Sequence, residues 1–158
     1  MKRVILFDWG NTLMVDFPQY SGKMYLWPEI EIVDQAHATL EKLRQDYDLY
    51  IATSAQDSSE SDVRAAFERG GLDIFIAGYF CKANVGIDKN CAEFYRSITH
   101  SLGQVASHVT MVGDSLEKDI LPAREAGLQT VYFNPQRHQV DEGITEIHCL
   151  SQLLEQKW

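Results

Sequence analysis

Aspartates and hydroxyl residues follow directly on short apolar runs at three places in this chain. Asp8 ends the first run, Asp114 ends a later one, and Thr53 and Ser54 end a third. Two carboxylates that are held close together repel each other unless a cation lies between them. Oxygen ligands without histidine or cysteine favour Mg²⁺, which binds one or two carboxylates together with water and substrate phosphate. These residues therefore predict a magnesium site that acts on phosphate groups.

A lysine supplies the positive charge that a transferring phosphoryl group needs. Lys89 lies in a polar stretch immediately before a helical pattern, and Lys82 follows a strand-like segment. The position directly before the helix favours Lys89, with Lys82 as the alternative. Neither aspartate turn has the Gly-x-x-x-x-Gly-Lys-Ser/Thr pattern, so the sequence does not support a P-loop nucleotide enzyme.

These side chains can meet only if a sheet brings them to one edge. Short apolar runs alternate with amphipathic stretches, which is typical of a parallel α/β sheet. We expect strands at residues 3–7, 49–53, 78–81, 108–112 and 128–133. In such a sheet, ligands bind beyond the carboxyl ends of the strands, where both aspartates lie.

Amphipathic stretches predict the helices that cover this sheet. Apolar residues recur at helical spacing in residues 33–44, 62–69, 91–102 and 151–156. A further helix over residues 119–126 accommodates Pro122 in its first turn if Asp119 is the N-cap. The 158 residues contain no repeat and no linker, so we expect a single domain, 1–158.

The charge balance excludes one class of function. Fourteen basic and twenty-three acidic side chains give a net charge of −9, which disfavours a general nucleic-acid binder. No apolar run has the length of a membrane span or a signal peptide, so we expect no membrane association. Cys81, Cys91 and Cys149 are scattered, which is typical of a reduced, cytoplasmic protein without a zinc site.

Four motifs, in this order, resemble those of the haloacid dehalogenase-like (HAD) hydrolases. Phe-Asp8-Trp-Gly-Asn-Thr-Leu is similar to the first motif of that family and Ile-Ala-Thr53-Ser54 to the second. Lys89 before a helix is similar to the third, and Gly-Asp114-Ser-Leu-Glu-Lys-Asp119-Ile to the fourth. The resemblance covers most of the chain. It implies a three-layer α/β/α Rossmann-like parallel sheet and a magnesium-dependent phosphatase.

The resemblance also implies how the carboxylates act. Asp8 would attack phosphorus and form an aspartyl-phosphate that water then hydrolyses. Mg²⁺ would be held by Asp8, Asp114 and the backbone carbonyl of Gly10. Asp119 would orient the lysine or a metal-bound water, supported by Ser115, although helix capping alone also explains Asp119.

The remaining motif residues would bind the phosphorylated substrate. The resemblance implies that Thr53, together with Ser54 and Asn11, contacts the phosphoryl oxygens. Lys89 would neutralise both the nucleophile and the phosphate.

One position departs from the family pattern. Most HAD phosphatases carry a second aspartate two residues after the nucleophile, where it protonates the leaving oxygen, and here that position is Gly10. Because general acid–base catalysis contributes about 10²–10⁴-fold, its loss predicts a slow enzyme unless another group substitutes. Asp16 is near in sequence, but we interpret it as a solvated loop carboxylate. The alternatives are a phosphonatase- or dehalogenase-type hydrolase, and a catalytically weak module that binds phosphate or a partner.

Residues 14–32 stand where related enzymes insert a cap. Dehalogenases and phosphonoacetaldehyde hydrolases use a sizeable helical cap, so this short interval disfavours both and makes Lys23 a poor Schiff-base candidate. We expect a minimal-cap member whose short flap leaves the site open, to be closed by a large substrate or by a second subunit of a homo-oligomer. Tyr20, Tyr25 and Trp27 would stack on a base or sugar, or pack against the core as such residues more commonly do.

Overall fold

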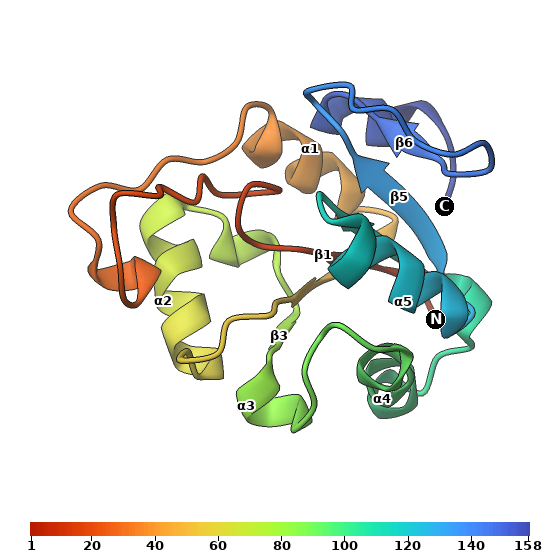
Figure 1. Cartoon of the computed structure of the whole chain (residues 1–158), viewed down its shortest axis with the longest axis horizontal. Coiled ribbons are helices and arrows are strands. Elements are labelled where there is room, and N and C mark those ends of the chain that lie inside the picture. The colour runs from red at the N-terminus through yellow and green to blue at the C-terminus, as the bar shows by residue number, and fades with distance from the viewer.

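A sheet of six parallel strands forms the centre of the computed structural model, which describes residues 1–158 (Figure 1). The strands are β1 (Arg3–Phe7), β2 (Tyr47–Ala52), β3 (Gly78–Phe80), β4 (Val109–Gly113), β5 (Gln129–Phe133) and β6 (Glu146–Ile147). Their order is β3-β2-β1-β4-β5-β6, so β1 is central. The five predicted strands are confirmed. The sixth, β6, was not predicted because two residues are too few to display a pattern.

Helices cover both faces of the sheet (Figure 1). They are α1 (Ala36–Leu43), α2 (Glu60–Gly70), α3 (Lys82–Val85), α4 (Ala92–Leu102) and α5 (Leu121–Glu125). Ile5 and Phe7 of β1 pack on the side of α1 and α2, while Val4 and Leu6 pack on the side of α4 and α5. This alternation along one strand confirms the three-layer α/β/α arrangement. None of these helices has the combination of length and apolarity that crossing a membrane requires.

Helix α2 has well-defined ends. At its start the Ser59 hydroxyl accepts a hydrogen bond from the Asp62 N–H (3.2 Å), and the Asp62 carboxylate accepts one from the Ser59 N–H (3.0 Å). This reciprocal cap satisfies two N–H groups that the helix itself leaves unpaired. At its end Gly71 adopts a left-handed conformation (φ 72°), which glycine accepts without strain and which ends the helix just after the predicted range 62–69.

The segment after β4 differs from the prediction. The helix that we expected over residues 119–126 is confirmed, since residues 116–125 are helical, but the expected N-cap at Asp119 is wrong. A wide π-type turn, Leu116–Ile120, precedes the short α5, and Ser115 caps it by accepting a hydrogen bond from the Lys118 N–H (3.2 Å). Asp119 is only 1% exposed because its carboxylate is turned inward toward a buried lysine, so it cannot cap a helix end.

Residues 14–32, which we call the flap, are irregular apart from one 3₁₀ turn, Met24–Leu26. The two ends of the flap lie together, since Met14 pairs with both Gly10 and Ile32. The flap is tied to α2 by an ion pair between Lys23 and Asp62 (2.7 Å) and by hydrogen bonds from Arg69 to backbone carbonyls of the flap. It is therefore an ordered wall beside the sheet edge.

Candidate active site

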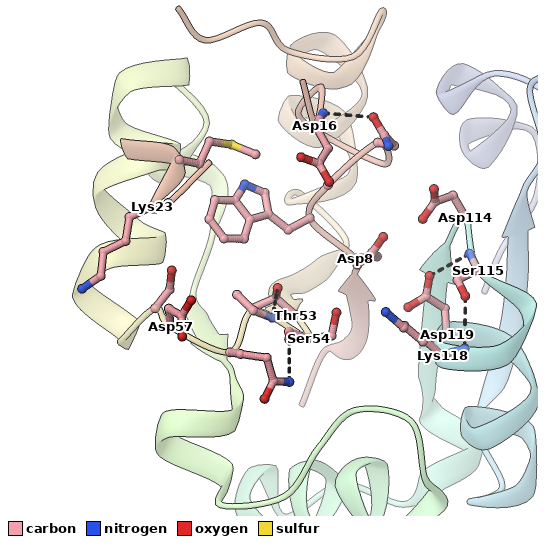
Figure 2. Close-up of a pocket in the computed structure, with 18 of the residues that line it drawn as sticks. Asp8, Asp16, Lys23, Thr53, Ser54, Asp57, Asp114, Ser115, Lys118 and Asp119 are labelled. Atoms are coloured by element: carbon pink, nitrogen blue, oxygen red, sulfur yellow. Dashed lines mark hydrogen bonds between the residues drawn. The ribbon is translucent and has the colours of Figure 1, made fainter. Parts of the chain in front are cut away.

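A pocket of about 440 Å³ lies beyond the carboxyl ends of β1, β2 and β4 (Figure 2). The loops after these strands contribute Asp8, Thr53 and Asp114 to its lining, and the flap contributes Lys23 and Trp27. Most of the lining residues are polar. The pocket is therefore suited to a charged or strongly hydrated ligand.

Asp8 lies at the end of the central strand. Its N–H donates to the Val112 carbonyl (2.9 Å), which continues the hydrogen-bond ladder with β4 and fixes its backbone. One carboxylate oxygen accepts from the Lys89 ammonium (2.7 Å) and the other from the Thr12 hydroxyl (3.0 Å). Burial raises the pKa of Asp8, but the Lys89 charge and the hydrogen bonds outweigh it and lower that pKa below its ordinary value. Asp8 is therefore an ionised carboxylate.

Lys89 is buried between two carboxylates. Its Nζ lies 2.7 Å from Asp8 Oδ1 and 2.6 Å from Asp119 Oδ1, and the residue is 2% exposed. Burial lowers the pKa of this lysine, yet the two carboxylates raise it above its ordinary value, so it stays charged. Asp119 is held in turn, because its Oδ2 accepts from the Ser115 N–H (3.0 Å).

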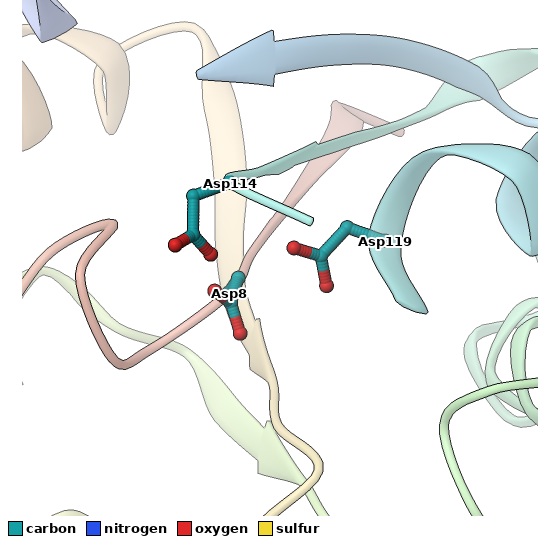
Figure 3. A group of neighbouring side chains, drawn as sticks. All are labelled: Asp8, Asp114 and Asp119. Carbon is teal, nitrogen blue, oxygen red and sulfur yellow. The ribbon is translucent and has the colours of Figure 1, made fainter. Parts of the chain in front are cut away.

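Three carboxylates meet at this end of the sheet (Figure 3). Asp8, Asp114 and Asp119 each offer an oxygen, and these oxygens lie within 4.8 Å of one another. Burial, a hydrogen bond with Asp8 and the Asp8 charge raise the pKa of Asp114 to about 8. Burial and the Asp8 charge raise that of Asp119 to about 6.

The carboxylate cluster carries more negative charge than the lysine balances. Three carboxylates share this region with one ammonium group, and the charges of Asp8 and Asp119 add to burial in raising the pKa of Asp114. A divalent cation would remove this repulsion. Because all the available donors are oxygens, the cluster fits Mg²⁺ better than zinc or copper.

Three of the predicted phosphate-binding residues, Thr53, Ser54 and Asn11, line the pocket, whereas the buried Lys89 does not. Thr53 is buried, and its Oγ1 accepts from the Ala55 N–H (3.1 Å), so its own proton is free to donate. Ser54 and Asn11 line the pocket, as do Gly10 and Ser115. Hydroxyl and backbone groups therefore surround the space in front of Asp8.

Other candidates lie elsewhere. Lys82 donates to the Gln56 side chain (3.0 Å) and pairs with Asp88 (3.3 Å) on the surface, so it is Lys89 and not Lys82 that contacts Asp8. Tyr20 and Tyr25 pack against the apolar core, and of the four aromatic residues in the flap only Trp27 lines the pocket.

Thr12 was missed by the sequence reasoning. It is fully buried, and its hydroxyl lies 3.0 Å from Asp8 Oδ2 and 3.5 Å from Asp114 Oδ1. The available signal was a hydroxyl residue in the turn that follows Asp8. Gln56, Asp57 and Lys118 also line the pocket without having been predicted.

Comparison with known proteins agrees with this geometry. The family model described as haloacid dehalogenase-like hydrolase matches residues 11–127. This range begins just after Asp8 and contains Thr53, Lys89, Asp114 and Asp119.

Similar proteins include one named as a nucleotidase and one named as a phosphatase. Pyrimidine 5'-nucleotidase PynA of Streptococcus pneumoniae is 28% identical over 138 residues, which are 84% of this chain and 57% of that protein. Ribulose-1,5-bisphosphate 5-phosphatase of Halopiger xanaduensis is 33% identical over 108 residues, 68% of this chain and 44% of that protein. The chain thus spans about half the length of these relatives. The crystal structure of the HAD-hydrolase YfnB of Bacillus subtilis, bound to magnesium, has a TM-score of 0.78 at 19% identity and covers 98% of this chain and 97% of that chain.

Proposed function

Because this chain belongs to the haloacid dehalogenase-like hydrolase family, we propose that it is a magnesium-dependent phosphomonoesterase whose nucleophile is Asp8. The observation that carries the proposal is the ionised Asp8 carboxylate, 2.7 Å from a buried ammonium group and beside Asp114 in a polar pocket. The names of the nucleotidase and the phosphatase among its relatives support a phosphate ester as the substrate class.

The proposed reaction has two displacements at phosphorus. In the first, an Asp8 oxygen bonds to phosphorus while the bond to the ester oxygen breaks, and the electron pair leaves with that oxygen. In the second, a water oxygen bonds to phosphorus and the bond to Asp8 breaks, which regenerates the carboxylate and releases inorganic phosphate. Lys89, 2.7 Å from Asp8, balances the Asp8 carboxylate before the first displacement and after the second.

The other residues hold the phosphoryl group and its charge. Thr53 donates its free hydroxyl proton to a phosphoryl oxygen, with Ser54 and Asn11 beside it. Asp119 positions Lys89 through their 2.6 Å ion pair. Bound Mg²⁺, held by Asp8, Asp114 and the Gly10 carbonyl, would neutralise the negative charge that builds up on the phosphoryl oxygens.

Gly10 supports a different class of function. Without a side chain at this position the leaving oxygen has no proton donor two residues after the nucleophile, so a module that binds phosphate or a partner without fast turnover is the second candidate.

A panel of phosphomonoesters tests the proposal. Sugar phosphates, nucleotides, phosphopeptides and p-nitrophenyl phosphate are offered to the protein with Mg²⁺ or with a chelator. We expect turnover only with Mg²⁺, and a loss of at least about 10³-fold in Asp8→Asn, because removing a nucleophile disables the whole catalytic unit. Asp46→Asn is the matched control, since the Asp46 side chain is 64% exposed and lies outside the pocket. Phosphate binding without turnover of any ester would favour the binding module instead.

A further inference from the structure

The side chain of Asp16 fills the space beside Gly10. A methyl group placed on Gly10 would lie 3.4 Å from Asp16 Cβ and 3.5 Å from Asp16 Oδ2. Asp16 also lines the same pocket as Asp8. The flap therefore delivers a carboxylate to the place where a longer side chain at position 10 would lie.

The turn after β1 holds Asp16 at this place. Asn11 adopts a left-handed backbone conformation (φ 61°), and its side-chain carbonyl accepts a hydrogen bond from the Asp16 N–H (2.9 Å). Met14 pairs with Gly10, and the Val15 N–H donates to the Glu31 carbonyl (2.8 Å). These bonds fix the start of the flap against the turn that follows Asp8.

The Asp16 carboxylate has no bonding partner within the protein. It forms no ion pair and accepts no hydrogen bond, and it is exposed to the pocket. Asp119, in contrast, forms an ion pair with Lys89, and Lys23 of the same pocket forms one with Asp62 (2.7 Å). In Figure 2 Asp16 enters from the top of the view, above Asp8, while Asp114 and Asp119 lie to the right.

We propose that Asp16 transfers the proton that the leaving oxygen requires, in place of the side chain that Gly10 lacks. The assignment rests on the proposed phosphomonoesterase function. It replaces our interpretation of Asp16 as a solvated loop carboxylate.

The proton balance closes over both displacements. As the phosphorus–oxygen bond of the ester breaks, the leaving oxygen takes the proton of the Asp16 carboxyl group, giving the alcohol, the Asp8 phosphoryl ester and an Asp16 carboxylate. Asp16 then accepts a proton from the water that attacks phosphorus. Inorganic phosphate leaves, and both aspartates return to their starting states.

The dependence on the leaving group tests this role. An alkoxide needs protonation, whereas p-nitrophenolate is a stable anion that leaves without it. We therefore expect Asp16→Asn to reduce kcat/KM for the best alkyl phosphate of the panel by about 10²-fold or more. The fold-loss in kcat/KM for p-nitrophenyl phosphate should be smaller by a factor of at least about 30. Asp57→Asn is the matched control, because it removes another exposed pocket carboxylate and should leave the ratio of the two rates unaltered.

Moving the carboxylate provides a second test. Gly10 has no left-handed backbone conformation, so it accepts a side chain once the Asp16 carboxyl group is removed. For the alkyl ester, kcat/KM of the double variant Gly10→Asp/Asp16→Ala should be at least about 10-fold higher than that of Asp16→Asn.

The outcomes separate the two proposals. If Asp16→Asn reduces both esters by the same factor while the unaltered protein turns over both, the role of Asp16 is overturned and the phosphomonoesterase stands. If the unaltered protein hydrolyses neither ester, the proposed function fails, and the assignment of Asp16 fails with it. Thermal unfolding of each variant shows whether it is folded.

Discussion

Lys89 is a charged side chain at a depth where an unpaired charge is costly. Its two carboxylate partners would lose their counter-charge in Lys89→Met, which keeps a similar chain length. Removing one partner from a buried ion pair typically costs about 3–5 kcal/mol, so we expect a loss of that size in the free energy of unfolding. Urea denaturation in a chelator measures it.

Lys82→Met is the control for this prediction. The Lys82 side chain is 44% exposed and its pair with Asp88 is on the surface, so its loss should cost no more than about 1 kcal/mol. Equal losses in the two variants would contradict the view that Asp8 and Asp119 depend on the buried ammonium group.

Asp114 makes the stability of the metal-free protein depend on pH. Its pKa is about 8 in the folded protein and near the ordinary 3.8 when unfolded, so between these values the folded state holds a proton that the unfolded state has lost. The free energy of unfolding therefore falls as pH rises toward 8. Asp119, at about 6, contributes to the same trend only at lower pH.

The prediction is checked by comparing denaturation at pH 6 and pH 8 in a chelator. The unaltered protein should lose more stability over this interval than Asp114→Asn, which has no proton to release. The same pH dependence in both proteins would show that Asp114 does not carry the effect.

The residues of the four motifs could be predicted from the sequence because each follows an apolar run or precedes a helix. Asp8, Thr53 and Asp114 line one pocket, and Lys89 contacts Asp8 beneath it. Thr12 could not be predicted as a site residue from the sequence. Its contact with two carboxylates depends on the path of a turn, and a turn has no periodic pattern.

At the scale of elements, the junction of β4 with the π-type turn is tightly packed. A methyl group on Gly113 would lie 2.1 Å from Asp119 Oδ2, so Gly113→Ala must displace the carboxylate that positions Lys89. We expect it to cost about 1–3 kcal/mol of stability and to lower turnover with Mg²⁺. Urea denaturation and the phosphatase assay measure the two effects.

Gly10→Ala serves as the matched stability control. Its methyl group would meet the nearest atom at 3.4 Å, an ordinary contact, so the free energy of unfolding should change by no more than about 0.5 kcal/mol. If Gly113→Ala were equally mild, the close approach of Asp119 to the strand would not matter.

The elements themselves followed from apolar periodicity, except where a tertiary contact decided the outcome. The stretch after Asp114 resembles an ordinary helix start, yet it forms a π-type turn in which Asp119 is turned inward to pair with Lys89. The partner of Asp119 lies in a different loop of the chain, so no local pattern could reveal it.

At the scale of the whole molecule, the carboxylate cluster joins β1 to the segment after β4. A cation that binds these carboxylates only in the folded state stabilises that state by mass action, by about 2.7 kcal/mol at a concentration one hundred times its Kd. For a chain of this length we therefore expect Mg²⁺ to raise the Tm by about 5–10 °C. Thermal unfolding with Mg²⁺ and with a chelator measures the shift.

Asp114→Asn provides the control, because it removes one carboxylate charge and keeps a side chain of nearly the same size. Its Tm should respond much less to Mg²⁺. Identical melting of the unaltered protein in Mg²⁺ and in chelator would contradict a magnesium site in this cluster.

The two backbone pairings of Met14 allow the flap, residues 14–32, to vary independently of the sheet. Met14 pairs with Gly10 on one side and with Ile32 on the other. The two ends of residues 14–32 therefore lie side by side and stay together whatever length of chain joins them. Lengthening or exchanging residues 19–29 would then cost little loop-closure entropy and leave the strand order untouched. The segment is thus a graft point, where the lining of the pocket can be exchanged without rebuilding the carboxylate cluster.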